Sequence, residues 1–398
     1  METYLLDWAN LLLRWVHVVT AIAWIGSSFY FVFLDNSLTP PQDEALRRDG
    51  ATGELWAVHG GGFYHPVKYA VAPPRLPERL HWFYWESYST WLSGFALFAL
   101  TYLWQAPLYL VDPQVMSWST PAAIASALAF LVVFWLLYDA ACRTLGPRRH
   151  GDAWVGLCVL LLVGAAAWGA TQLFAGRAAF LLVGAMLATA MSANVAHWII
   201  PGQRKVVAAL RAGQPVDPVH GQRGKQRSVH NTYFTLPVVF AMLSTHYSFL
   251  YSHPQRAWIL LGLMLAGAAI RQFFVLRHGH KLGRHRHPWP YAAVGVVLIA
   301  GLVWVLRPAA SVAVAVPERV SDEQVLALTQ QRCAMCHGAQ LQSKNVRLDT
   351  LADLHRLAPL VYQQVVVSRA MPLNNATGIT EDERALVARW YASRSAEN

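Results

Sequence analysis

The chain has 398 residues, of which 55% are hydrophobic and only 14% charged, and it contains 17 tryptophans. This composition fits a protein with several membrane-spanning helices better than a soluble one. The formal net charge of +10 does not indicate nucleic-acid binding, because the lysines and arginines lie in loops between apolar stretches and not on one amphipathic face.

Apolar stretches of about 20 residues, enough to cross a bilayer as a helix, occur eight times along the chain. They lie at 9–34, 84–104, 121–142, 154–172, 178–200, 232–251, 257–276 and 289–306. The first has no basic segment before it and no small-residue cleavage pattern, so we expect it to stay as a helix and not to be removed as a signal peptide. The pattern predicts an all-α fold whose main part, residues 1–307, is an eight-span transmembrane bundle.

The number of lysines and arginines differs sharply between alternate connecting segments. The segments 35–83, 143–153, 201–231 and 277–288 hold 5, 3, 6 and 4 of them, whereas 105–120, 173–177 and 252–256 hold 0, 1 and 1. Basic loops stay on the cytoplasmic side. We therefore expect both termini outside, and the long segment 35–83 folded over the cytoplasmic mouth.

Ionisable residues inside the spans are candidates for function, because each costs about 2.5–3.5 kcal/mol or more in the bilayer. On the first helix His17 shares a face with Trp24 and Ser28 that should point toward other helices. Any one such histidine also suits a plain interhelical hydrogen bond, and Asp139 and Glu86, which lie near span ends, also suit the membrane interface. The candidates are Arg14, His17, Glu86, Asp139, His197, His246 and Arg271.

The stretch HNTYFTLP at 230–237 adds His230 at the start of the sixth span. Its alternative role is local, since Asn231 or Thr232 would suit the N-cap of a helix.

After a tether at 308–317, residues 318–398 (the tail) have ordinary charge density and the signals of soluble helices. Ser321 with Gln324, and Thr380 with Glu383, have the spacing of a capping box. About 80 residues bury little apolar surface, so such a domain gains from a covalently held group in its core.

That group is indicated by RCAMCHG at 332–338. Two cysteines separated by two residues, with a histidine directly after the second, are the attachment sequence of a c-type haem. Cys333 and Cys336 would form the thioethers and His337 would be the proximal iron ligand. A redox disulfide or half of a zinc site is the alternative, although no second cysteine pair exists. Covalent haem is attached on the oxidising outer side of bacterial membranes, in agreement with the loop charges.

The second iron ligand is expected in a turn downstream. Met371 in SRAMPLNNATG fits, because a proline and a turn-rich stretch follow it. Its alternative is core packing. The tail is thus predicted to be a class I-like cytochrome c domain that carries one electron, so the donor reaction belongs to the membrane part.

Three stretches together resemble one family: WVHVVTAIAWIGSSFYF, HNTYFTLP and VYQQVVVSRAMPLNNATGITEDERALVARWY. They are similar to the bacterial membrane-bound urate oxidases that pass electrons to their own cytochrome c domain. The first span also resembles a membrane protoporphyrinogen oxidase family in which a histidine holds a haem b. Carried over to His17, this resemblance implies that a second haem, a haem b held by His17, is an open alternative. His197 departs from the urate oxidase pattern, where an apolar or aromatic residue is expected.

The resemblance implies an oxidoreductase of the bacterial inner membrane. It would oxidise urate to 5-hydroxyisourate in purine breakdown and send the electrons to the respiratory chain, through a soluble cytochrome c or a terminal oxidase, and not to oxygen. Urate is a flat anion, so Arg14 or Arg271 would balance its charge, and His17, His230 or Glu86 would accept its proton. Two alternatives stay open: an electron-relay cytochrome subunit, and a haem-b-dependent oxidase of a porphyrinogen-like substrate.

Overall fold

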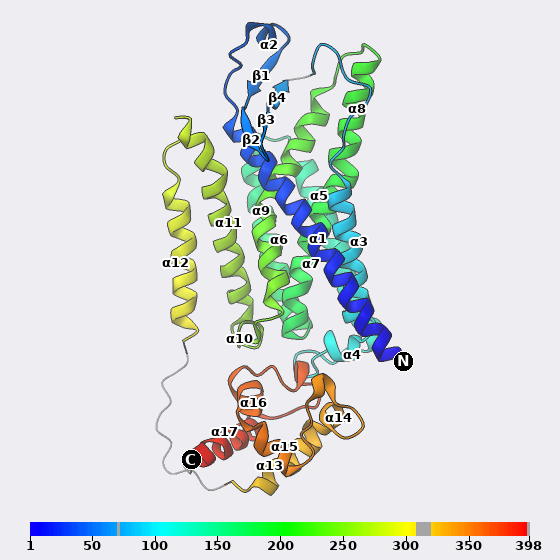
Figure 1. Ribbon diagram of the computed structural model, residues 1–398, viewed down its shortest axis with the longest axis vertical. Helices are drawn as coiled ribbons and strands as arrows, with labels where there is room; N and C mark the ends of the chain where they lie inside the picture. Colours follow the sequence, from blue (N-terminus) through cyan, green and yellow to red (C-terminus); the bar gives the residue numbers. More distant parts are fainter. Residues whose placement is uncertain (70–71, 308–319, 396–398) are drawn as a thin grey trace.

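The computed structural model describes residues 1–69, 72–307 and 320–395, and it is 72% helix and 4% strand. The largely helical fold was predicted. Every one of the eight apolar stretches contains a helix, and these helices form one bundle (Figure 1). They are α1 (Glu2–Ser37), α3 (Trp85–Phe98), α5 (Thr120–Leu145), α6 (Gly151–Leu173), α7 (Gly176–Asn194), α9 (Pro218–Ser244), α11 (Arg256–Lys281) and α12 (Trp289–Val305).

Five helical stretches in the described part of the chain are long and apolar enough to cross a membrane: Tyr4–Ser37, Thr120–Leu145, Gly151–Leu173, Gly176–Arg211 and Arg256–Lys281. The fourth combines α7 with η2 (Val195–Ile199) and α8 (Ile200–Arg211). Of the others, α3 has 14 residues before it continues into η1 (Ala99–Leu103), and α12 has 17. The structure thus supports a membrane protein, while the count of eight spans stays a prediction.

Helix α7 is the centre of the bundle. Most of its residues are buried, and it packs against α5, α6 and α9. The approach to α9 is close because Gly184 has no side chain, and a Cβ there would lie 2.6 Å from that of Ala241. The core of the membrane part therefore lies around a helix that is apolar on all sides.

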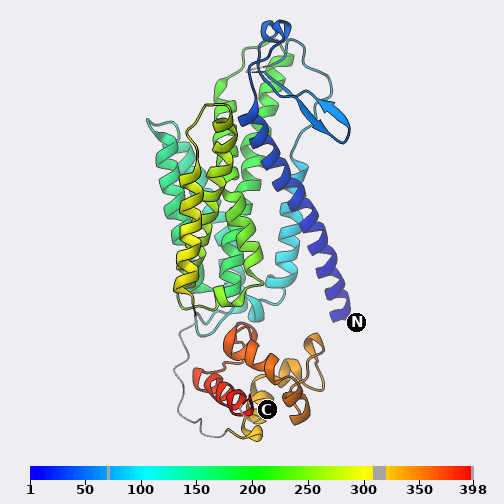
Figure 2. The same ribbon diagram turned by 60° about the vertical axis from the view of Figure 1, so that its left-hand side comes forward.

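The segment between α1 and α3 contains strands, which the all-α prediction missed. After α2 (Glu44–Arg48), β1 (Ala51–Glu54) pairs with β4 (Val67–Tyr69), and β2 (Ala57–His59) pairs with β3 (Gly62–Tyr64), both antiparallel. Gly60 and Gly61 form the tight turn of the second hairpin with φ of 59° and 81°, as two-residue hairpin turns require. The segment lies at the end of the bundle opposite the tail (Figures 1 and 2).

The tail lies at the end of the bundle that also holds the N-terminus (Figure 2), and it has a hydrophobic cluster of its own around the fully buried Trp390. Its helices are α13 (Asp322–Arg332), α14 (Ala334–His337), η3 (Ser343–Asn345), α15 (Leu351–Arg356), α16 (Ala358–Tyr362), η4 (Gln363–Val367), η5 (Leu373–Asn375) and α17 (Glu381–Ser395). The predicted tether at 308–317 lies outside the described residues.

Both predicted capping boxes are present. Ser321 and Gln324 exchange hydrogen bonds of 2.9 and 3.3 Å at the start of α13. Thr380 and Glu383 exchange bonds of 2.7 and 3.2 Å before α17. Each box satisfies two amide groups that the first helical turn leaves unpaired.

Glu383 predicts a pH dependence of the tail's stability. Burial raises the pKa of its carboxyl, but hydrogen bonds from Arg332 and from the Thr380 amide outweigh burial and hold the pKa below its ordinary value. A carboxyl with a lowered pKa stabilises the fold above its unfolded pKa, and that contribution is lost as the pH falls through the folded pKa. We expect Glu383→Gln to lower the free energy of unfolding of the tail by about 1 kcal/mol at neutral pH. Below about pH 4.5 the variant should lose less stability than the wild-type protein, as measured by calorimetric unfolding. Exposed Glu323→Gln is the control, and equal acid sensitivity in both variants would contradict the assignment.

Candidate functional site

A cavity of about 250 Å³ lies between α1, α3, η1, α7 and the end of α9. Its lining combines basic and aromatic side chains, and none of the described residues that line it is an aspartate or glutamate. The chemically informative residues are Arg14, His17, Trp24, Trp91, Phe95, Tyr102, Arg177 and His246. Such a lining favours a ligand that is flat, apolar on its faces and negatively charged.

His17 is held in one orientation by α3. Its Nδ1 lies 3.1 Å from the carbonyl oxygen of Thr90 and 3.3 Å from Oγ of Ser93. A carbonyl can only accept a hydrogen bond, so Nδ1 donates and Nε2 keeps its lone pair. Gly94 allows this packing, because a Cβ there would lie 2.7 Å from Cε1 of the imidazole. The inward face predicted for His17 is confirmed by its place in the cavity lining.

Two arginines line the cavity, and they differ in their surroundings. Arg14 is exposed and its guanidinium donates to Oδ1 of Asn10 at 3.2 Å. Arg177 lies at the start of α7, its Nε is buried, and this atom has no hydrogen-bond partner among the described residues. A buried donor without a partner is costly, which suits a group that binds an anion. The sequence had shown Arg177 merely as one basic residue in a short loop; its signal was an isolated arginine beside an apolar helix.

Aromatic rings form one wall of the cavity. Trp91 and Phe95 stack with centroids 5.2 Å apart and planes 13° apart, and Phe98 stacks on Tyr102 at 5.7 Å. Nε1 of Trp91 donates to Oγ1 of Thr189 at 3.1 Å, which fixes the indole against α7. These faces offer a stacking surface for a heteroaromatic ligand.

The structure does not bring the other predicted catalytic residues to this cavity. His230 lies on α9, where its Nδ1 is 2.8 Å from the hydroxyl of Tyr138. Asn194 donates to that hydroxyl at 3.1 Å and to Oδ1 of Asn231 at 2.9 Å. Because α9 begins at Pro218, Asn231 lies inside a helix, and the alternative in which it caps one is wrong.

Arg271 and Glu86 occupy two further places. Arg271 is 2% exposed, lies 3.6 Å from the centroid of Phe29 and donates through Nε to the Thr232 carbonyl at 3.3 Å. Glu86 lies in the first turn of α3, and its Oε2 is buried with no partner among the described residues. Neither residue lines the cavity.

Of the remaining intramembrane candidates, only His246 lines the cavity. Asp139 forms a buried ion pair with Arg227 at 2.8 Å and a second pair with the exposed Arg143 at 3.1 Å. It does not line the cavity, and its carboxylate holds helices together. His197 is exposed beside Trp135 on the outside of the bundle.

In the tail, the attachment sequence forms a single turn. Cys333 ends α13, and Cys336 and His337 lie in α14, so both thiols and the imidazole are presented within four residues of each other. Burial raises the pKa of the Cys333 thiol to about 11. Burial also raises the pKa of the inner cysteine of a redox pair, so a redox disulfide stays the alternative to haem attachment.

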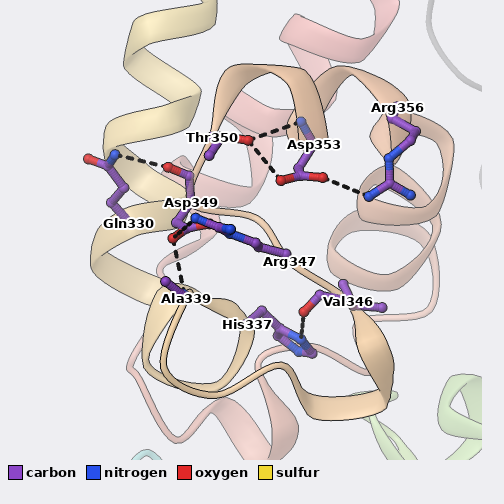
Figure 3. A network of polar contacts seen from close by, with 9 residues as sticks. All are labelled: Gln330, His337, Ala339, Val346, Arg347, Asp349, Thr350, Asp353 and Arg356. Carbon is purple, nitrogen blue, oxygen red and sulfur yellow. Dashed lines mark hydrogen bonds and ion pairs between the residues drawn. The ribbon is translucent and has the colours of Figure 1, made fainter.

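His337 is oriented by the loop that follows it (Figure 3). Its Nδ1 lies 3.2 Å from the carbonyl oxygen of Val346 and therefore donates, which leaves Nε2 with the lone pair that an iron ligand needs. The loop is fixed by Asp349, which accepts hydrogen bonds from Arg347 and from the Ala339 amide at 3.1 Å. The donor set fits a haem c.

Met371 borders the same apolar cluster as Cys333. Its carbonyl oxygen accepts a hydrogen bond of 2.9 Å from the buried Arg384, which ties the loop before η5 to α17. Met371 thus borders the same cluster as Cys333, its role as second iron ligand stays a prediction, and core packing remains its alternative.

One comparison with known proteins identifies the membrane part. A family model described as "Urate oxidase N-terminal" matches residues 3–307, which include the eight long helices and the cavity. Comparisons with curated proteins and with solved structures gave no match. Since the model covers most of the sequence, the chain belongs to the urate oxidase N-terminal family.

Proposed function

We propose that this protein oxidises urate to 5-hydroxyisourate in the cavity beside α1 and passes the electrons through a haem c in the tail to the respiratory chain. The observation that carries the proposal is the cavity's lining: Arg14 and Arg177 supply positive charge, aromatic rings supply a stacking surface, and no described lining residue is a carboxylate that would oppose an anion. Membership of the urate oxidase N-terminal family supports the substrate.

The reaction removes two electrons and one proton from the urate monoanion, and one water adds at C5 to give neutral 5-hydroxyisourate. The arginines would bind the urate anion, and the free face of the stacked pair Trp91 and Phe95 would lie against its plane. His17 would accept a proton at Nε2, since its Nδ1 is occupied by the Thr90 carbonyl. His230, Glu86 and Arg271 lie outside this cavity, and we propose no catalytic role for them.

The same Nε2 of His17 fits the iron of a haem b, the role that the resemblance to the protoporphyrinogen oxidase family implies. A haem b would store one electron between the two oxidation steps. A difference spectrum separates the two roles: a b-type band that disappears in His17→Ala supports ligation, and its absence from the wild-type protein supports proton transfer alone.

In the tail, Cys333 and Cys336 would hold the haem c covalently and His337 and Met371 would be its axial ligands. The haem would supply a one-electron carrier. The residues 1–307 and 318–398 would then be two functional domains, one oxidising urate and one exporting electrons, joined by the tether at 308–317.

Anaerobic addition of urate to the purified protein tests the proposal. We expect the reduced haem c band to appear, with 5-hydroxyisourate formed in half the amount of electrons delivered. A haem c that urate does not reduce would favour the alternative of an electron-relay cytochrome subunit. Reduction of the haem by a porphyrinogen, and not by urate, would favour the alternative of a porphyrinogen oxidase.

Met371→Ala tests the axial ligand. We expect the haem to stay attached, because the thioethers are untouched, while its spectrum and potential change with the loss of the sulfur ligand. Visible and near-infrared spectra of the oxidised protein measure this change. Met335→Ala is the matched control, because Met335 is exposed between the two cysteines. Survival of the methionine-to-iron charge-transfer band in Met371→Ala would contradict the ligand set.

We propose that the protein lies in the bacterial inner membrane with the tail in the periplasm, on the strength of the loop charges and of the haem chemistry. Reporter fusions after residue 215 are expected to be cytoplasmic, and fusions after residue 317 periplasmic. Alkaline phosphatase and fluorescent-protein activities measure the two sides. The opposite location at either point would overturn the topology.

A further inference from the structure

Asn374 joins the tail to the membrane part by hydrogen bonds. Nδ2 of Asn374 donates to the carbonyl oxygens of Leu108 and Tyr109 at 2.7 and 3.1 Å. This brings η5 against α4 (Ala106–Tyr109), the short helix that follows η1. Asn374 has φ of 49°, a conformation that asparagine tolerates better than most residues.

A cleft of about 200 Å³ lies beside this contact. Asp112, Gln114 and Arg256 line it from the membrane part, and Glu381 and Arg384 line it from the tail. The two parts therefore meet over a polar surface that is not closely packed, and the hydrogen bonds of Asn374 are its defined anchor.

A row of aromatic rings leads from the cavity to this anchor. Trp91 and Phe95 are 5.2 Å apart between centroids, and Phe95 and Phe98 are 6.4 Å apart. Phe98 and Tyr102 follow at 5.7 Å, and Tyr102 and Tyr109 at 5.6 Å. The row thus begins at a residue of the cavity lining and ends at a residue whose carbonyl binds Asn374.

The position of the anchor in the tail matters equally. Asn374 follows Met371 by three residues, and Met371 borders the cluster that contains Cys333. A tail anchored through Asn374 therefore brings the loop that holds Met371 toward the end of the aromatic row.

We propose that Asn374 is the docking residue that joins the tail to the aromatic row, and that electrons leave the cavity one at a time along Trp91, Phe95, Phe98, Tyr102 and Tyr109. This proposal rests on the proposed oxidation of urate. Each electron moves from the cavity to the tail's haem, so urate is oxidised and the haem reduced, and the rings bridge the transfer without gaining or losing protons.

The contact is small, but it acts within one chain. The tether at 308–317 joins the two parts covalently, so the tail meets its docking surface at a high effective concentration and does not have to find it by free diffusion. Two hydrogen bonds of about 1 kcal/mol each are then enough to favour the docked state by tenfold or more.

The first test measures docking without enzymatic activity. Gln114→Cys and Glu381→Cys place one thiol on each side of the cleft, and a short bismaleimide added to membranes should link them. Asn374→Asp keeps the shape of the side chain and its backbone preference. It replaces the Nδ2 donor by a carboxylate oxygen, which cannot donate to the carbonyl oxygens of Leu108 and Tyr109. We expect it to lower the docking equilibrium constant at least tenfold, so that half of the molecules or more are undocked and the initial rate of cross-linking falls about twofold or more. Asn345→Asp is the matched control, since Asn345 also has positive φ, 56°, in the tail.

The second test measures electron transfer in the full-length holoprotein. Asn374→Asp should slow urate-driven haem reduction in anaerobic stopped flow, while reduction by dithionite, the haem spectrum and its potential stay as in the Asn345→Asp control. Tyr109→Leu should also slow urate-driven reduction, and Tyr109→Phe should not, because it keeps the ring.

The outcomes separate the two proposals. Absence of urate-driven reduction in the wild-type protein would overturn the proposed function, and the cross-linking yield would still decide the docking. Reduction at the wild-type rate in both Asn374→Asp and Tyr109→Leu would overturn the docked route and leave urate oxidation intact. Loss of reduction in Tyr109→Phe as well would overturn a bridge of rings, because the hydroxyl would then be required.

Discussion

Replacing Arg177 with alanine is expected to weaken urate binding by roughly tenfold to 150-fold, since a hydrogen bond to a charged group contributes about 1.5–3 kcal/mol. Nε of Arg177 is buried and has no partner among the described residues, so an anion in the cavity would meet a donor that nothing else competes for. Equilibrium binding of urate to the oxidised protein, together with the urate dependence of haem reduction, measures the effect.

Two variants control this experiment. Arg177→Lys keeps the charge but loses the planar fork that can bind an anion with two parallel bonds, so it should recover part of the affinity. Arg307→Ala removes an arginine that lies against Trp304, outside the cavity lining, and should leave the affinity unchanged. An unaltered dissociation constant in Arg177→Ala would exclude the cavity as the urate site.

Arg14 should matter less than Arg177, although the sequence pointed to Arg14 first. Its guanidinium is exposed and already bonded to Asn10, so water and Asn10 compete with the ligand for its donors. An exposed arginine on the first helix attracts notice in a hydropathy scan, whereas Arg177, at the boundary of a loop, does not.

The sequence predicted the helices well because a continuous apolar stretch reports directly on burial in lipid. It predicted less well where helices are stabilised by each other. The first half of α9, from Pro218 to Asn231, is polar and was interpreted as a loop. Its start had a local signal that was not used, since Asp217 caps the helix and Pro218 holds its first position. Its packing rests on Arg227, buried against Asp139 at 2.8 Å, a long-range pair that no local pattern contains.

The candidate site shows the same division. The inward face of His17 follows from helical periodicity, and the turn of Cys333, Cys336 and His337 follows from a local motif. The separation of His230 and Arg271 from the cavity does not follow from either, because it depends on how helices distant in sequence pack. The hairpin at Gly60 and Gly61 had a local signal, a glycine run flanked by apolar residues, that was interpreted only as a loop.

The division of labour between the two parts makes the strongest prediction. Replacing Cys333 and Cys336 together by alanine should prevent haem attachment and reduce urate turnover with respiratory acceptors to background. Urate binding should persist, since the cavity lies wholly in the membrane part. Cys158→Ala is the matched control, because Cys158 is also a free cysteine but lies in α6.

The number of electrons that urate gives up predicts which part of the reaction the haem-free variant can still carry out. Urate gives up two electrons and one haem c accepts one, so the intact protein must reoxidise its tail between the two transfers or hold one electron in the membrane part. If His17 ligates a haem b, the variant should take up a single electron from urate and stop, which a b-type band would show in anaerobic titration. If the membrane part holds no carrier, the same titration should give no spectral change at all. Oxidation of urate at the full rate by the variant, with hydrogen peroxide as product, would mean that oxygen is the acceptor and that the tail does not carry the electrons.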